Sequence, residues 1–332
     1  MTPADLSLTV QHAVRRAVDD GALRVDVPPR VKVERARPGG TGEYASSVAL
    51  SLARPAGRSA LDVAGVLKER LQGAPGILAV DITGPGFLNF TLRSDAGGDL
   101  VRAIRSAGHE YGHGTALAGT VVRFAEVTES RAQVVTSVVA RLLRAQGADV
   151  SFDGGERIPV RPATYLPQEF GVDAARWQLL RAAPSDRALD GAPLLVQHER
   201  NSLFRVRYAH ARVRRLLVNG LQYGITPADA RETDARETDA RETDTHASEL
   251  LGVLGDHPLV LLAAARHRAP DRVARHLEAT ADALLAFQHT VLPLGDEKPS
   301  AAHRSRLALA EAAGTVLAGG LSLLGISAPD QI

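Results

Sequence analysis

The densest basic cluster of the chain carries an aromatic side chain in its middle. Tyr208 and Arg212 are four residues apart, which places them on one face of a helix, and Arg215 follows within one further turn. Further arginines in the same stretch are Arg205, Arg207 and Arg214. An aromatic ring can stack on an unpaired nucleic-acid base, and guanidinium groups can bind it or its phosphates. The alternatives are a solvated charged face with Tyr208 in the core, and a structural role for His210.

A second basic stretch runs from Arg266 to His276 and includes Arg272. It is either a phosphate-binding surface or simply an exposed helix face. The whole chain has a formal net charge of only +1, so there is no global attraction toward nucleic acid, and any basic surface must be local.

Several other kinds of site are not expected. The sequence has no cysteine, which excludes disulfides and thiolate zinc sites. His109 and His113 are four residues apart, but the glycines around them favour a loop, and no acidic third ligand lies nearby. The loop at residues 38–42 lacks the Lys-Ser/Thr ending of a phosphate-binding P-loop. We therefore expect no metal site and no catalytic residues in the chain.

The elements of the first half predict an α/β arrangement. Hydrophobic spacing predicts helices at 5–20, 44–52, 60–71 and 99–107, and apolar runs predict strands at 31–35, 77–82 and 87–92. A strand at 121–127 precedes a helix from Ser130 to about Ala145, with Gln133 at the spacing of a capping box. Glycines and prolines predict a loop over 150–170.

The second half predicts a helical bundle. After a short helix at 172–181, long helical segments are expected at 194–222, 247–254, 257–266, 270–290 and 301–324. A tandem repeat of Asp-Ala-Arg-Glu-Thr covers residues 229–243, and its five-residue period matches neither helix nor strand repeats, so a solvated, zwitterionic loop or a frayed helix is expected. The first residues lack the pattern of a secretion signal, and the longest apolar stretch, Leu259–Ala265, is far below the roughly 20 residues that span a bilayer.

Several motifs together resemble bacterial-type arginyl-tRNA synthetases. Gly42 to Leu50 (GEYASSVAL) and Gly84 to Phe90 (GPGFLNF) are similar to elements of that family's N-terminal domain. Val206 to Arg212 (VRYAHAR) and Leu321 to Pro329 (LSLLGISAP) are similar to the first and last parts of its anticodon-binding domain. The resemblance implies that Phe87 and Asn89 contact the D-loop of tRNA. Taken with the two basic stretches, it makes Tyr208, His210, Arg212, Arg215 and Arg272 the expected tRNA-binding residues. For Phe87 the alternative is a core position after a tight turn.

The departure from the family pattern is equally specific. Where the family has a histidine- and glycine-rich loop that binds the ATP phosphates, only Thr128-Glu129-Ser130 stands between strand and helix. Asp149 and Gly171 are separated by about 20 residues, where a full synthetase holds most of its nucleotide fold, and the expected lysine loop is replaced by Glu156 to Pro162 without lysine. Adenylate chemistry needs preorganised positive charge around a transferring phosphate, so autonomous aminoacylation is not expected.

These observations predict an α+β protein with three parts: an N-terminal α/β tRNA-contact domain (1–113), a truncated nucleotide-fold remnant (114–190) and an all-α DALR-type anticodon-binding bundle (191–332). The expected function is non-catalytic binding of tRNA, in particular tRNA(Arg), in the cytoplasm and away from membranes. ATP would be needed only if ligase activity remains. A full-length synthetase or another tRNA-using enzyme is a further candidate partner. The alternatives are arginine–tRNA ligase activity with a core supplied by another chain, and a protein-interaction module.

Overall fold

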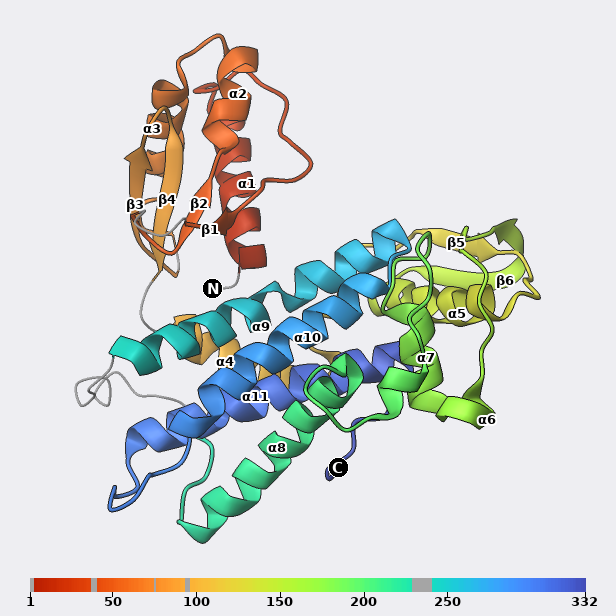
Figure 1. The fold of residues 1–332 in the computed structure, drawn as a ribbon. Coiled ribbons are helices and arrows are strands. Elements are labelled where there is room, and N and C mark those ends of the chain that lie inside the picture. Colours follow the sequence, from red (N-terminus) through yellow and green to blue (C-terminus); the bar gives the residue numbers. More distant parts are fainter. Residues whose placement is uncertain (1–2, 37–40, 75, 93–95, 229–240) are drawn as a thin grey trace. The chain divides into compact units, whose positions relative to one another are not determined.

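The computed structural model describes residues 3–36, 41–74, 76–92, 96–228 and 241–332 (Figure 1). Its contacts divide the chain into unit 1, Met1–Leu100, and unit 2, Val101–Ile332. Unit 1 mixes helices with a sheet, whereas the later part of unit 2 is helical. The α+β class predicted from the sequence is therefore confirmed.

In its described residues, unit 1 contains a four-stranded antiparallel sheet and helices that pack against it. The strands follow the order β1-β2-β4-β3, and the longest ladder joins β3 to β4 through a tight hairpin. Its elements are α1 (Pro3–Asp19), β1 (Glu34–Arg35), β2 (Tyr44–Ser46), α2 (Val48–Ala56), α3 (Ala60–Leu71), β3 (Ile77–Thr83) and β4 (Phe87–Leu92). One continuous apolar core, which includes Leu6, Leu67 and Phe90, joins the helices to the sheet. This core holds the β3–β4 hairpin in place.

The helix predicted at 44–52 is wrong in its first three residues. Tyr44 to Ser46 form β2, which pairs with β4, and the helix begins only at Val48. Ladder bonds to a strand more than 40 residues away override the local helical pattern. The loop before β2 also depends on this pairing, because a Cβ atom on Gly42, whose φ is +75°, would lie 2.5 Å from the Phe90 carbonyl oxygen.

Unit 2 begins with a small β-α-β arrangement. β5 and β6 pair in parallel, with α5 as the connecting helix. The elements are α4 (Ala96–Ala107), β5 (Val121–Phe124), α5 (Ser130–Ala145), β6 (Asp149–Glu156), α6 (Pro167–Phe170) and α7 (Val172–Leu180). The loop predicted over 150–170 is thus wrong for residues 150–156, which belong to β6, and for Pro167–Phe170, which form α6. Gly154 and Gly155 favour a loop in the sequence but lie within this strand. Gly155 is so close to β5 that a Cβ atom there would be 2.2 Å from the Arg123 carbonyl oxygen.

The remainder of unit 2 is the predicted helical bundle (Figure 1). It consists of α8 (Ser202–Gln222), α9 (Arg241–His267), α10 (Asp271–Phe287) and α11 (Ala301–Leu324), with short 3₁₀ turns at Gly108–Glu110, Ala192–Leu195 and Gln288–Thr290. α11 packs against α8, α9 and α10, and most of its residues are buried. The predicted start of the first helix at 194 is wrong, because Asn201 caps α8 by accepting a hydrogen bond from the Phe204 amide.

The two helices predicted at 247–254 and 257–266 are one helix. α9 continues through Pro258, which has no N–H to offer the carbonyl of Leu254 four residues earlier. Tyr111 supplies the missing donor, since its hydroxyl lies 3.3 Å from the Leu254 oxygen. A side chain from far away in the sequence thus satisfies the backbone group that proline leaves unpaired.

Two helices of unit 2 have the length and apolar composition of a membrane span, in α9 from Thr245 to His267 and in α11 from Ala301 to Leu324. The span in α11 is 78% buried within the protein, so its apolar composition is explained by its place in the core of the bundle. The repeat at 229–243 lies outside the described residues except for its last three, which belong to the first turn of α9.

Candidate nucleic-acid interface

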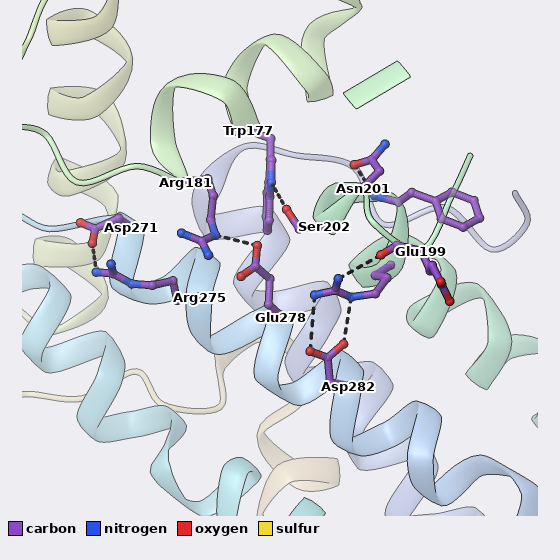
Figure 2. Close-up of polar contacts among 11 residues, drawn as sticks. Trp177, Arg181, Glu199, Asn201, Ser202, Asp271, Arg275, Glu278 and Asp282 are labelled. Atoms are coloured by element: carbon purple, nitrogen blue, oxygen red, sulfur yellow. Dashed lines mark hydrogen bonds and ion pairs between the residues drawn. The ribbon is translucent and has the colours of Figure 1, made fainter. Parts of the chain in front are cut away.

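Helix α8 is fixed firmly at its beginning. The indole Nε1 of Trp177 donates to the Ser202 hydroxyl at 3.0 Å (Figure 2). The side-chain amide of Asn201 donates to the carbonyls of Leu194 and Val196. Arg205 of α8 forms an ion pair with Asp282 of the neighbouring α10, with 2.9 Å between Nε and Oδ1. These contacts fix the direction in which the rest of α8 presents its side chains.

The exposed face of α8 carries an aromatic platform beside a surface hollow. Tyr208 is 40% exposed and stacks on Phe204, with ring centroids 5.7 Å apart. The hollow has a volume of about 710 Å³ and is lined by Tyr208, Arg212, Arg214, Arg215, Leu217, Val218, Leu221 and residues 330–332. Tyr208 is therefore not a core residue, and its expected contact with RNA stays a prediction. A planar base could stack on the ring and enter the hollow.

The arginines of α8 differ in their charge partners. Arg205, Arg207 and Arg214 face the carboxylates of Asp282, Asp173 and Asp330 respectively. Arg212 instead donates from Nε to the neutral amide oxygen of Gln288 at 2.7 Å, and Arg215 is exposed to solvent. Arg212 and Arg215 both line the hollow, so they contribute positive charge beside Tyr208.

His210 lies on a different side of α8 from Tyr208. It is only 6% exposed, and its Nδ1 is 2.9 Å from the carbonyl oxygen of Pro329. Burial lowers the pKa of His210, and the hydrogen bond to the Pro329 carbonyl partly opposes this effect. The geometry therefore gives His210 a structural contact, and its expected contact with RNA stays a prediction.

The β3–β4 hairpin of unit 1 presents the second candidate surface. Phe87 begins β4 and is 38% exposed, which makes its ring accessible. Asn89 is 6% exposed, and its Nδ2 donates to the Thr83 hydroxyl at 2.6 Å across the hairpin. The structure thus uses the Asn89 amide to hold the turn that carries Phe87. A direct contact between Asn89 and RNA stays a prediction.

The second basic stretch is partly engaged in internal ion pairs. Arg268 closes α9 in the left-handed region and binds Glu156 at 2.8 Å, while Arg275 pairs with Asp271 one turn earlier on α10 (Figure 2). Arg272 lies between them on α10 and is exposed. Arg272 is therefore accessible, as are Arg266 and His267 at the end of α9, and none of the three lies on α8.

The amino end of α5 is occupied by a carboxylate of the chain itself. Glu129 caps the helix: its Oε2 accepts from the Ala132 amide at 2.6 Å, and its Oε1 accepts from the Ala163 amide at 3.0 Å. The capping residue predicted from the sequence, Ser130, is wrong by one position, and Gln133 donates instead to the Val127 carbonyl. The amino end of a helix attracts anions, and here the carboxylate of Glu129 already occupies it, bound by the amides of Ala132 and Ala163.

Arg131, the second residue of α5, binds the backbone of residues 161–186. Its side chain is fully buried and donates to five backbone carbonyls, those of Arg161, Leu179, Ala182, Ala183 and Asp186. Burial lowers the pKa of Arg131, while nearby Glu129 and Asp186 act in the opposite direction. The guanidinium therefore ties α5 to residues 161–186 and is not available to a ligand. Among the described residues, no group of three or more His, Asp or Glu side chains could hold a metal ion.

Sequence reasoning missed the apolar part of the hollow on α8. Val218 and Leu221 lie in steps of three from Arg215, so extending the spacing of Tyr208, Arg212 and Arg215 by two turns would have found them. Phe204, which lies four residues before Tyr208, follows the same rule. Asp330 could not have been found in this way, because it reaches Arg214 from a distant part of the chain.

Comparison with known proteins assigns both parts of the chain. Residues 6–92 match the family described as "Arginyl tRNA synthetase N terminal domain", and residues 206–332 match the "DALR anticodon binding domain". Two similar curated proteins are the "Arginine--tRNA ligase" of Frankia alni, 41% identical over 196 residues, and that of Micrococcus luteus, 42% identical over 193 residues. These alignments cover 56% and 52% of this chain but only 35% of each relative, so the chain spans about a third of their length.

Solved structures show the same fold. Arginyl-tRNA synthetase from Thermus thermophilus aligns over 100% of both chains with a TM-score of 0.70 and 13% identity. The enzyme from Plasmodium falciparum aligns over 99% of both chains with a TM-score of 0.66 and 7% identity. The chain therefore carries an arginyl-tRNA synthetase N-terminal domain at residues 6–92 and a DALR anticodon-binding domain at residues 206–332, and it shares its fold with these solved structures.

Proposed function

We propose that this protein binds tRNA, with tRNA(Arg) as the preferred partner, and that it does so without catalysing aminoacylation. The observation that carries the binding part is the exposed face of α8, where Tyr208, Arg212 and Arg215 surround one hollow. An aromatic ring supplies stacking energy for an unpaired base, and the two guanidiniums supply phosphate contacts. The DALR match over the same residues supports an anticodon loop as the occupant.

The non-catalytic part is supported by the amino end of α5. A nucleotide fold binds phosphates at the helix that follows its first strand, through free amide groups and helix polarity. In this chain Glu129 already accepts bonds from Ala132 and Ala163, and its negative charge would repel a phosphate there. In the described part of unit 2, the sheet contains only β5 and β6. We therefore propose a role in holding or presenting tRNA to a synthetase or another tRNA-using enzyme in the cytoplasm.

A binding titration tests this proposal. The purified chain is titrated with a tRNA(Arg) transcript and with random-sequence RNA of equal length, at several salt concentrations. We expect tighter binding to the tRNA, and an affinity that falls steeply as salt rises because phosphate contacts release counterions. Equal affinity for both RNAs at low salt would overturn the proposal.

Two variants locate the surface. Tyr208→Ala should weaken tRNA binding by about 5- to 150-fold, because stacking contributes about 1–3 kcal/mol per base. Tyr223→Ala is the matched control, since Tyr223 is also exposed and lies just after α8 but does not line the hollow. Arg215→Gln should reduce the slope of log affinity against log salt concentration by about 1, the value for one lost phosphate contact. Equal effects of the two tyrosine variants would place the surface elsewhere.

The alternative of ligase activity has its own assay. Exchange of pyrophosphate into ATP in the presence of arginine reports adenylate formation directly. We expect no exchange above background from the purified chain. Pyrophosphate exchange above background would contradict the non-catalytic part of the proposal. If Tyr208→Ala then lost only the later transfer of arginine to tRNA, the chain would be a working enzyme.

A further inference from the structure

A row of basic side chains on α8 lies beneath the segment that follows α11. Arg207, His210 and Arg214 are spaced three and four residues apart, so they share one face of the helix. Each contacts the segment at residues 327–330: Arg207 donates to the Ser327 hydroxyl at 3.4 Å, His210 Nδ1 is 2.9 Å from the Pro329 oxygen, and Arg214 pairs with Asp330 at 2.9 Å. We call residues 327–330 the strap.

The strap has a defined point of attachment. α11 ends at Gly325, whose φ of +71° turns the chain, and the next residue, Ile326, is buried. Before this point the chain is held by Arg141 and Arg176, which donate to the carbonyls of Ser322 and Leu324. Beyond Ile326 the strap lies on the surface, and Ser327 and Asp330 are exposed. Its first residue is also bound by Asp173, which accepts a hydrogen bond from the Ser327 amide at 3.0 Å.

The strap is a weak ligand for a basic row. It offers one carboxylate, and its other contacts are a hydroxyl and a carbonyl. The pair between Arg214 and Asp330 is open to water, with side chains 51% and 66% exposed, and exposed pairs of this kind contribute little stability. Charge-assisted bonds from guanidinium to phosphate are stronger than bonds to neutral acceptors. A phosphate chain would therefore be a better partner for the same row.

The strap also forms part of the wall of the candidate RNA surface. Arg214 and Asp330 line the hollow beside Tyr208, and they line a second hollow of about 560 Å³ that also contains His210. Movement of Asp330 away from Arg214 would remove a negative charge from the wall of both hollows. It would leave Arg214 available next to Arg212 and Arg215.

We propose that the strap is an autoinhibitory contact, in which Asp330 occupies Arg214 in place of an RNA phosphate and is displaced when RNA binds. The inference rests on the proposed function, because it assigns the RNA backbone as the displacing partner. It identifies Arg214 as an additional phosphate-binding position that the ion pair with Asp330 conceals, whereas Arg207 also faces Asp173, which is not part of the strap.

Affinity measurements on the full chain test the competition. Asp330→Asn should bind tRNA about two- to fivefold more tightly than the natural chain, as expected from the modest strength of an exposed ion pair. Asp153→Asn is the matched control: Asp153 also pairs with an arginine at 2.9 Å, its side chain is 59% exposed, and it lies on β6. Arg214→Gln should weaken binding, and Asp330→Asn should have no further effect when Arg214 is already replaced.

Hydrogen exchange gives a second readout that does not depend on affinity. Saturation with tRNA should speed amide exchange in the peptide that contains the strap, because the Ser327 amide loses its bond to Asp173 when the strap leaves. Slower exchange there on RNA binding, or equal gains from Asp330→Asn and Asp153→Asn, would overturn the autoinhibitory role. Failure of the natural chain and all variants to bind tRNA would instead overturn the proposed function itself.

Discussion

Replacement of Arg131 tests how much of the stability of unit 2 depends on one buried charge. Its guanidinium is fully buried and donates to five carbonyls, at distances between 2.6 and 3.2 Å. Arg131→Met keeps an unbranched side chain of similar length but removes every donor. The five carbonyls then lose this donor. The Ala183 oxygen keeps its bond from the Asp186 amide, and the others lose a charge-assisted bond that water replaces only where it can reach them.

The expected magnitude follows from two opposing effects. Bonds to a charged group contribute about 1.5–3 kcal/mol each, which would amount to roughly 7–15 kcal/mol for five independent bonds. Burial of the charge costs several kcal/mol, and methionine avoids that cost. We expect a net loss of about 3–5 kcal/mol in the free energy of unfolding, a large share of the roughly 5–15 kcal/mol that stabilises a domain. Arg131→Lys should lose less, because an ammonium offers three donors.

The chain contains its own reporter for this measurement. Trp177 is its single tryptophan, is fully buried, and lies on α7 between the elements that Arg131 connects. Urea unfolding followed by tryptophan fluorescence therefore reports on unit 2. Arg144→Met is the control on the same helix, because Arg144 is exposed and donates to the Val150 carbonyl at 2.8 Å. If Arg131→Met changes the unfolding free energy by less than about 0.5 kcal/mol, the carbonyl network does not stabilise the unit.

Two further predictions concern the bundle. Burial lowers the pKa of His276 to about 4 and also lowers that of its neighbour His257, so both rings are neutral in the folded protein. The unfolded chain binds the proton first as pH falls, so stability present above about pH 6.5 should be lost between pH 6.5 and 4, by about 3 kcal/mol for His276. Urea unfolding at several pH values measures this, His276→Phe should flatten the profile, and a flat profile in the natural chain would contradict the assignment. Gly319→Ala should destabilise unit 2 by about 1–3 kcal/mol, because its Cβ would lie 2.8 Å from the His109 carbonyl oxygen, whereas Gly65→Ala on α3 meets nothing within 4 Å and should be neutral or stabilising by up to about 1 kcal/mol. Calorimetric unfolding of both variants measures the change in stability. Equal changes for Gly319→Ala and Gly65→Ala would contradict the steric explanation.

Local patterns were sufficient where an element depends on its own residues. The helices Ala60–Leu71, Ser130–Ala145 and Ala301–Leu324 were predicted within a residue or two of their observed bounds, because apolar spacing and flanking stop signals lie within each segment. The β3–β4 hairpin was predicted for the same reason, since Gly84, Pro85 and Gly86 mark its turn. The exposed arginines around Tyr208 follow from helical spacing alone.

Elements that depend on distant partners could not be predicted. Tyr44 to Ser46 become a strand only because β4 lies beside them, and Pro258 stays inside α9 only because Tyr111 satisfies the Leu254 carbonyl. The candidate site shows the same division. Helical spacing predicted that Tyr208, Arg212 and Arg215 lie close together, but the tertiary structure decided that Asn89 and His210 turn inward and that Asp330 pairs with Arg214. The physical reason is that a side chain's exposure and charge depend on what the rest of the chain brings beside it, which no local pattern contains.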